Sequence, residues 1–134
     1  MVAYNFKARF IDPIRAGTKD QTIRVNRAGR SRHARENEAL ALYRGMRTKH
    51  CFLIAKARCR LVRPIQLVFG RKPAVIIGAR LDPETYAISQ EGLDAFATRD
   101  GFKDWDDLCA FWRKEHGALD QFEGTLIRWK DLRI

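Results

Sequence analysis

The segment GTKDQTIR, residues 17–24, holds the side chains of this sequence whose types and spacing best suit chemistry. Lys19, Thr22 and Arg24 follow Gly17 closely, and a short β-prone run that begins at Thr22 would place Thr22 and Arg24 on the same side of a strand. A hydroxyl and a guanidinium on one surface, with an ammonium nearby, suit a phosphate or a carbonyl oxygen. The pattern G-x-K-x-x-T-x-R is short, however, so spacing alone favours an ordinary solvated turn.

A basic loop is predicted directly after this motif. Residues 26–37, NRAGRSRHAREN, have no hydrophobic periodicity and are rich in arginine. Guanidinium groups favour forked contacts to phosphates or stacking on bases. The candidate ligand-binding residues are Gly17, Arg24, Arg27, Arg30, Arg32 and Arg35. The alternative is a solvated loop that only aids solubility, and His33 is expected to be an ordinary loop histidine.

The charge of the chain is divided unevenly along its length. The 134 residues include 26 Lys and Arg against 16 Asp and Glu, for a net charge of +10. Residues 1–80 hold 19 basic and 4 acidic residues, whereas residues 81–134 hold 7 basic and 12 acidic residues. Such segregation predicts a positive face, for which nucleic acids or nucleotides are the natural partners. A membrane surface is a weaker match, because the Arg-rich region has no apolar stripe at helical spacing.

The acidic half contributes one candidate for the site. Asp100 lies in the sequence RDGF between two predicted helices, where its carboxylate could point into a cleft. An ordinary Asp-Gly turn is the alternative. Asp106 and Asp107 are explained by the first turn of a helix, where carboxylates stabilise the helix dipole. Trp129 could be a core residue or the wall of a base-binding pocket.

Several classes of protein are not expected from this sequence. No apolar run approaches the roughly 20 residues of a membrane span, and the first ten residues lack the order of a signal peptide. The three cysteines have no CxxC spacing, so neither a disulfide framework nor a metal site is predicted, and no cofactor motif is found. We therefore expect one cytoplasmic domain over residues 1–134, without membrane or metal partners, whose thiols are buried or half-buried.

The elements that must position these residues alternate between strands and a few helices. Strands are predicted at residues 4–10, 22–25, 38–43, 51–62, 65–69, 75–80 and 122–129. Pro64 is expected to limit the long fourth strand. Helices are predicted as one short turn from Asp12 as N-cap to Gly17, at residues 91–98, and from Asp104 as N-cap to Gly117. Together they predict a small α+β protein, a partly open β-barrel capped by helices.

Three stretches of the sequence resemble the ASCH family of the PUA-like superfamily. They are FKARFIDPIRAGTKDQTIR at residues 6–24, LDAFATRDGFKDWDDLCAFW at residues 93–112 and FEGTLIRW at residues 122–129. The resemblance covers nearly the whole chain, and residues 32–51 are similar to family members often found in phages and prophages. It implies a small β-barrel with flanking helices and a cleft that binds RNA or modified nucleosides.

The resemblance also implies a possible reaction. Some small bacterial members remove the acetyl group from N4-acetylcytidine with a Lys, a Thr and a Glu. The first two match Lys19 and Thr22, and the third falls at Asp100, which is one methylene shorter. In that scheme Thr22 attacks the acetyl carbonyl, Lys19 takes its proton and Asp100 protonates the leaving nitrogen or holds the base edge, while Arg24 stabilises the oxyanion or clamps a phosphate.

We therefore expect binding of RNA or a nucleobase. An amidohydrolase is the alternative, and a ribonuclease that uses the same basic cluster is a weaker one.

Overall fold

A computed structural model describes residues 1–27 and 32–134 of the chain. Its helical elements are η1 (Ala8–Phe10), a 3-10 helix, and the α-helices α1 (Ile11–Ala16), α2 (Gln90–Arg99) and α3 (Trp105–His116). Its strands are β1 (Val2–Phe6), β2 (Gln21–Arg24), β3 (Ala39–Arg44), β4 (Phe52–Val68), β5 (Ala74–Ala79), β6 (Asp82–Ala87) and β7 (Gln121–Arg133).

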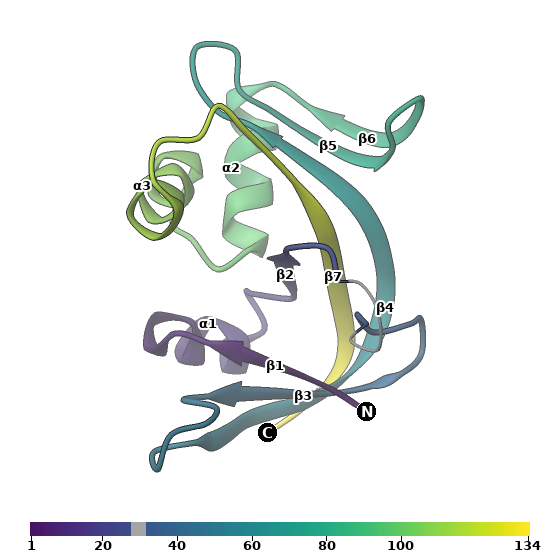
Figure 1. Ribbon diagram of the computed structural model, residues 1–134, viewed down its shortest axis with the longest axis vertical. Helices are drawn as coiled ribbons and strands as arrows, with labels where there is room; N and C mark the ends of the chain where they lie inside the picture. Colours follow the sequence, from purple (N-terminus) through teal and green to yellow (C-terminus); the bar gives the residue numbers. More distant parts are fainter. Residues whose placement is uncertain (28–31) are drawn as a thin grey trace.

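Two long strands, β4 and β7, form the centre of one seven-stranded sheet. They pair antiparallel along most of their length, and β7 pairs with β2 on its other edge. The other edge of β4 pairs first with β3 and then with β5, which pairs in turn with β6. β1 runs parallel to β3. Figure 1 shows that β4 and β7 are strongly curved and that the helices lie on their concave side.

The α+β class is confirmed, and over the described residues the sheet is not closed into a barrel, so the finer prediction of a partly open, PUA-like barrel stays a prediction. Among the described residues, β1 pairs only with β3 and β2 only with β7. A side chain links β1 to β2 instead, because Arg24 Nη2 donates to the carbonyl oxygen of Asn5 at 2.6 Å. Residues of both strands, among them Asn5 of β1 and Thr22 of β2, line the pocket described below.

Three local predictions were wrong for identifiable reasons. β4 continues through Pro64 because residues 60–64 have no strand partner on one edge, where a missing N–H is tolerated. The first strand ends at Phe6 because the 3-10 helix follows, and α1 has Phe10 rather than Asp12 as its N-cap. β6 was not predicted, because its residues are nearly all exposed and show no alternation.

Other local predictions were confirmed. Gly17 ends α1 with a left-handed φ of 82°, and the Asp104 side chain caps α3 by accepting from the backbone N–H of Asp107 at 2.9 Å. Trp129 is a core residue that packs edge-on against Phe6. Of the cysteines, Cys59 is buried, Cys109 is half-buried and Cys51 is exposed, which corrects the expectation for Cys51.

Within residues 1–27 and 32–134, no helix is long and apolar enough to cross a membrane, and no group of three His, Cys, Asp or Glu side chains is placed to hold a metal ion.

Candidate functional site

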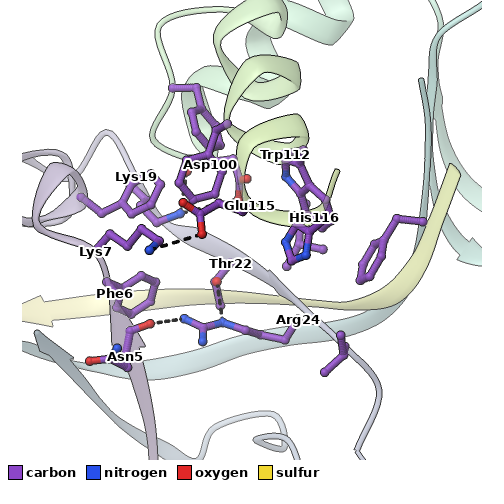
Figure 2. A pocket seen from close by; sticks show the side chains of 16 residues that line it. Asn5, Phe6, Lys7, Lys19, Thr22, Arg24, Asp100, Trp112, Glu115 and His116 are labelled. Atoms are coloured by element: carbon purple, nitrogen blue, oxygen red, sulfur yellow. Dashed lines mark hydrogen bonds and ion pairs between the residues drawn. The ribbon is translucent and has the colours of Figure 1, made fainter. Parts of the chain in front are cut away.

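A pocket of about 310 Å³ lies between β1, β2 and α3. Lys19, Thr22, Arg24 and Asp100, the four residues that the reaction scheme brings together, all line it (Figure 2). Lys19, Thr22 and Asp100 are buried, so three polar side chains are withdrawn from solvent at one place. Their chemical roles stay predictions.

Lys19 is positioned by the turn that follows α1. The left-handed conformation of Gly17 reverses the chain, and the backbone N–H of Lys19 then donates to the Pro13 carbonyl at 3.0 Å. The next residue, Asp20, accepts two hydrogen bonds from the Arg99 guanidinium at 2.7 and 2.9 Å. This clamp ties the segment that carries Lys19 to the end of α2. Gly17 itself does not line the pocket.

The Lys19 ammonium is surrounded by one carboxylate and two aromatic rings. Nζ donates to the backbone carbonyl of Asp100 at 2.5 Å and lies 3.7 Å from Asp100 Oδ1. It also lies 4.5 Å from the centre of the Phe10 ring and 5.6 Å from that of Phe6. The ammonium is thus held by a charge-assisted hydrogen bond, an ion pair and cation–π contacts.

Burial shifts the pKa values of this pair in opposite directions. It lowers the pKa of Lys19 to about 8, because desolvation outweighs the attraction of the Asp100 carboxylate. It raises the pKa of Asp100 above its usual value, against the opposing effects of Lys19 and a hydrogen bond from Gln21 Nε2. At neutral pH a larger share of the Lys19 side chains is therefore neutral than of an exposed lysine.

Gly101 explains how Asp100 comes so close to Lys19. Asp100 is the C-cap of α2, and Gly101 follows with a φ of 96°, which side chains rarely allow. A Cβ atom at Gly101 would lie 2.8 Å from Lys19 Cδ and 2.9 Å from Phe10 Cδ1. Glycine at position 101 is therefore required by packing as well as by the turn.

Thr22 and Arg24 share one face of β2, as predicted. Arg24 Nε donates to Thr22 Oγ1 at 3.0 Å, and the guanidinium lies over the rings of Phe6 and Tyr4. Burial lowers the pKa of Arg24 to about 10, so it remains charged at neutral pH. Thr22 Oγ1 accepts this hydrogen bond, and a hydroxyl that accepts can still donate its own proton, so Thr22 can donate to a ligand.

Helix α3 supplies a wall that was not assigned to the site from the sequence. Trp112 packs at 4.6 Å from both His116 and Phe122, measured between ring centres, and all three line the pocket. At the same side, Lys7 Nζ and Glu115 Oε2 form an ion pair at 3.3 Å (Figure 2). Glu115 and His116 follow Trp112 by three and four residues on the predicted helix, so helical spacing places them on one face with Trp112 but does not show that this face meets the pocket.

Of the loop arginines, Arg27, Arg32 and Arg35 belong to the described residues, and none of these three lines the pocket. Arg27 lies over the Tyr4 ring and donates to the Arg32 carbonyl, and Arg32 forms two hydrogen bonds with Glu38 at 2.7 and 2.8 Å. Arg35 is exposed. Arg30 lies outside the described residues. A role of these residues in binding nucleic acid stays a prediction.

His33 has a defined structural place. Its Nδ1 is 3.0 Å from the Tyr4 hydroxyl and its Nε2 is 2.7 Å from the Val25 carbonyl. His33 therefore connects the loop to β1 through the Tyr4 hydroxyl. This is a more specific structural role than that of the ordinary loop histidine that was expected.

No family model, no curated protein and no solved structure matches this chain. The geometry of the site is the evidence for its function. The polar side chains of Lys19, Thr22 and Asp100 share one pocket with the aromatic rings of Trp112, His116 and Phe122.

Proposed function

We propose that the chain is a PUA-like domain of the ASCH type that binds a nucleobase, free or within RNA, in this pocket. The observation that carries the proposal is the meeting of buried polar side chains with an aromatic wall in one cavity of about 310 Å³. A cavity of this size is at the lower end of the range for small-molecule sites, which suits a base or a nucleoside.

The two sides of the pocket suit the two properties of a base. The rings of Trp112, Phe122 and His116 offer an apolar surface against which a flat heterocycle can stack. The hydroxyl of Thr22 and the carboxyl of Asp100 can bind the polar edge of the base, as proteins do when they recognise unpaired bases. The Arg24 guanidinium, charged at neutral pH, can bind a carbonyl or phosphate oxygen.

Calorimetric titration with cytidine, uridine, adenosine, guanosine and N4-acetylcytidine tests this proposal. At least one nucleoside should bind the unaltered chain, and Thr22→Val should weaken that binding about tenfold or more, since a buried hydrogen bond is lost. Thr85→Val, on the exposed strand β6, is the matched control and should bind normally. Absence of binding to every nucleoside, or equal binding by Thr22→Val, would contradict the proposal.

A second candidate function is hydrolysis of an acylated base, which the lowered pKa of Lys19 beside Thr22 favours. Thr22 Oγ would attack the acyl carbonyl and give its proton to neutral Lys19. The amide C–N bond would then break, and the leaving amine would take a proton from Asp100, whose pKa is raised above its usual value by burial. Water would release the acyl group from Thr22 as a carboxylic acid.

Incubation with N4-acetylcytidine separates this candidate from simple binding. Release of cytidine and acetate, abolished in Thr22→Val and retained in Thr85→Val, would establish the hydrolase. If the chain binds the nucleoside but releases no product, and Asp100→Glu is also inactive, the hydrolase is excluded. Labelled single-stranded RNA in the same incubation tests the ribonuclease, which requires cleavage of the strand.

A further inference from the structure

The convex face of the sheet carries a second concentration of charge, on the side away from the pocket. We call it the basic ladder; its members are Lys56, Arg58 and Arg60 on β4 and Lys130 and Arg133 on β7. All five side chains are exposed. Ala57, Cys59 and Trp129, which alternate with them, are buried. Alternation along β4 directs Lys56 and Arg58 to the outer surface, and the register places Arg133 and Lys130 directly opposite them, with an irregularity in β7 that accommodates their spacing of three residues. The exposed Arg60 follows at a second register shift.

The register of the two strands places like charges opposite one another. Lys56 pairs with Arg133, and Arg58 pairs with Lys130. Directly opposed like charges destabilise a sheet. Positive charge is also crowded beside the ladder, at Arg128. Burial lowers the pKa of Arg128, and the charges of Arg99 and of the ladder residue Arg60 also lower it, to about 10.

The ladder is not neutralised within the chain. Among the described residues, no ion pair joins any of its five members to a carboxylate, and its only hydrogen bond to another part of the fold runs from Arg58 to the Asn37 carbonyl at 2.6 Å. The nearby basic residue Arg63, in contrast, is paired with both Glu36 and Glu84. Asp131 is the only acidic residue within residues 56–60 and 128–133.

We propose that the basic ladder binds the phosphate backbone of a polynucleotide strand. The opposed pairs Lys56–Arg133 and Arg58–Lys130 follow one another along the two strands, and directly opposed residues have Cβ atoms about 5 Å apart, so the surface offers a double row of positive charge to a linear polyanion. Binding phosphates removes the repulsion between the opposed pairs, and the ladder's arginines can form forked contacts with phosphate oxygens. The inference extends the proposed function, because it names the surface that would hold the rest of an RNA ligand.

A polynucleotide fits this surface better than an anionic membrane does. Membrane binding requires apolar side chains interleaved with the basic ones. The exposed large apolar residues Phe52, Leu53 and Ile134 lie at one end of the ladder, and none lies between its charges.

A fourfold glutamine variant, Lys56→Gln, Arg60→Gln, Lys130→Gln and Arg133→Gln, tests the inference while sparing Arg58. The matched control removes four charges elsewhere, as Lys49→Gln, Arg71→Gln, Lys72→Gln and Arg80→Gln, all at exposed positions. Fluorescence anisotropy with a labelled 20-nucleotide single-stranded RNA is measured between 50 and 200 mM salt. The slope of log affinity against log salt should fall by about 3 in the ladder variant and by less than about 1 in the control.

Other measurements separate the possible failures. The ladder variant should melt no lower than the unaltered chain, because like-charge repulsion has been removed. Equal slopes in ladder variant and control would overturn the inference, as would tighter binding to phosphatidylserine vesicles than to RNA. If nucleosides bind but the salt slope of the ladder variant is unchanged, the ladder proposal is wrong and the pocket proposal is retained. If the salt slope of the ladder variant falls but no nucleoside binds, the pocket proposal is wrong and the ladder proposal is retained.

Discussion

The Lys19 ammonium lies 3.7 Å from the Asp100 carboxylate, although 81 residues separate the two along the chain. One comes from the turn after α1 and the other from the end of α2, and both are buried. An ion pair of this kind is costly to desolvate, so its presence in a pocket that also contains Thr22 and Arg24 is better explained by function than by stability.

Removal of the Asp100 carboxylate should reveal the free-energy cost of burying the Lys19 charge without its partner. Asp100→Asn leaves Lys19 opposite a neutral amide, so we expect the free energy of unfolding at pH 7 to fall by about 3 kcal/mol. Urea denaturation measures the loss. Asp106→Asn, at an exposed carboxylate in the first turn of α3, is the control and should cost less than about 1 kcal/mol. Equal losses would show that the buried pair has no special place in the fold.

The lowered pKa of Lys19 predicts a dependence of stability on pH. Between about pH 8 and pH 10.5 the unfolded chain binds the Lys19 proton more tightly than the folded chain does, so this residue's contribution to stability should rise with pH. The gain across that window is at most about 3 kcal/mol. Cys59 and Cys109 have pKa values raised to about 11 and act in the opposite direction. The difference between the unaltered chain and Lys19→Met therefore isolates the lysine.

The measurement is a set of denaturation curves from pH 7 to pH 10.5 for both proteins. The unaltered chain should gain stability relative to Lys19→Met as the pH rises. Parallel curves would mean that the folded and unfolded chains bind the Lys19 proton equally.

Gly101 offers a steric test of the site. Gly101→Ala must accept both a φ of 96° and close contacts with Lys19 and Phe10, so we expect a loss of about 3 kcal/mol and weaker nucleoside binding. Gly17→Ala is the matched control, because its φ is also left-handed at 82° but nothing lies within 4 Å of the added Cβ. It should lose only about 1 kcal/mol. Thermal or urea unfolding of both variants compares the two costs, and equal losses would exclude a steric contribution.

The ion pair between Lys7 and Glu115 should control which ligands enter. Both side chains remain partly exposed, so Glu115→Gln should barely change stability. It removes a negative charge at the pocket and frees the Lys7 ammonium, so binding of a nucleoside 5′-monophosphate should tighten by about three- to tenfold relative to the nucleoside. Glu123→Gln, at an exposed position on β7, is the control. Calorimetry on both ligands gives the ratio, and an unchanged ratio would place the ion pair outside the binding site.

The parts of the site that depend on local sequence were predictable, and the parts that depend on packing were not. The turn at Gly17 and the shared face of Thr22 and Arg24 follow from short-range rules. Asp100 could be placed near them only through the family resemblance, because no local rule joins positions 81 residues apart. Glu115 was missed because helical spacing shows which residues share a face and not which surface that face meets.

The same distinction between local patterns and packing applies to the prediction of the fold. The caps of α3 and the alternation in the first half of β4 could be predicted, since both are local patterns. The open edge between β1 and β2 depends on which strands pair, as does the tolerance of Pro64 within β4. The opposed charges of Lys56 and Arg133 required the register of β4 with β7, which the sequence alone does not give.

A crystal structure of the chain grown with the tightest-binding nucleoside tests the central claim most directly. The base is predicted to lie in the pocket between Trp112 and Thr22, with a polar edge within hydrogen-bond distance of Thr22, Lys19 or Asp100. A nucleoside bound elsewhere, with the pocket empty, would contradict the account.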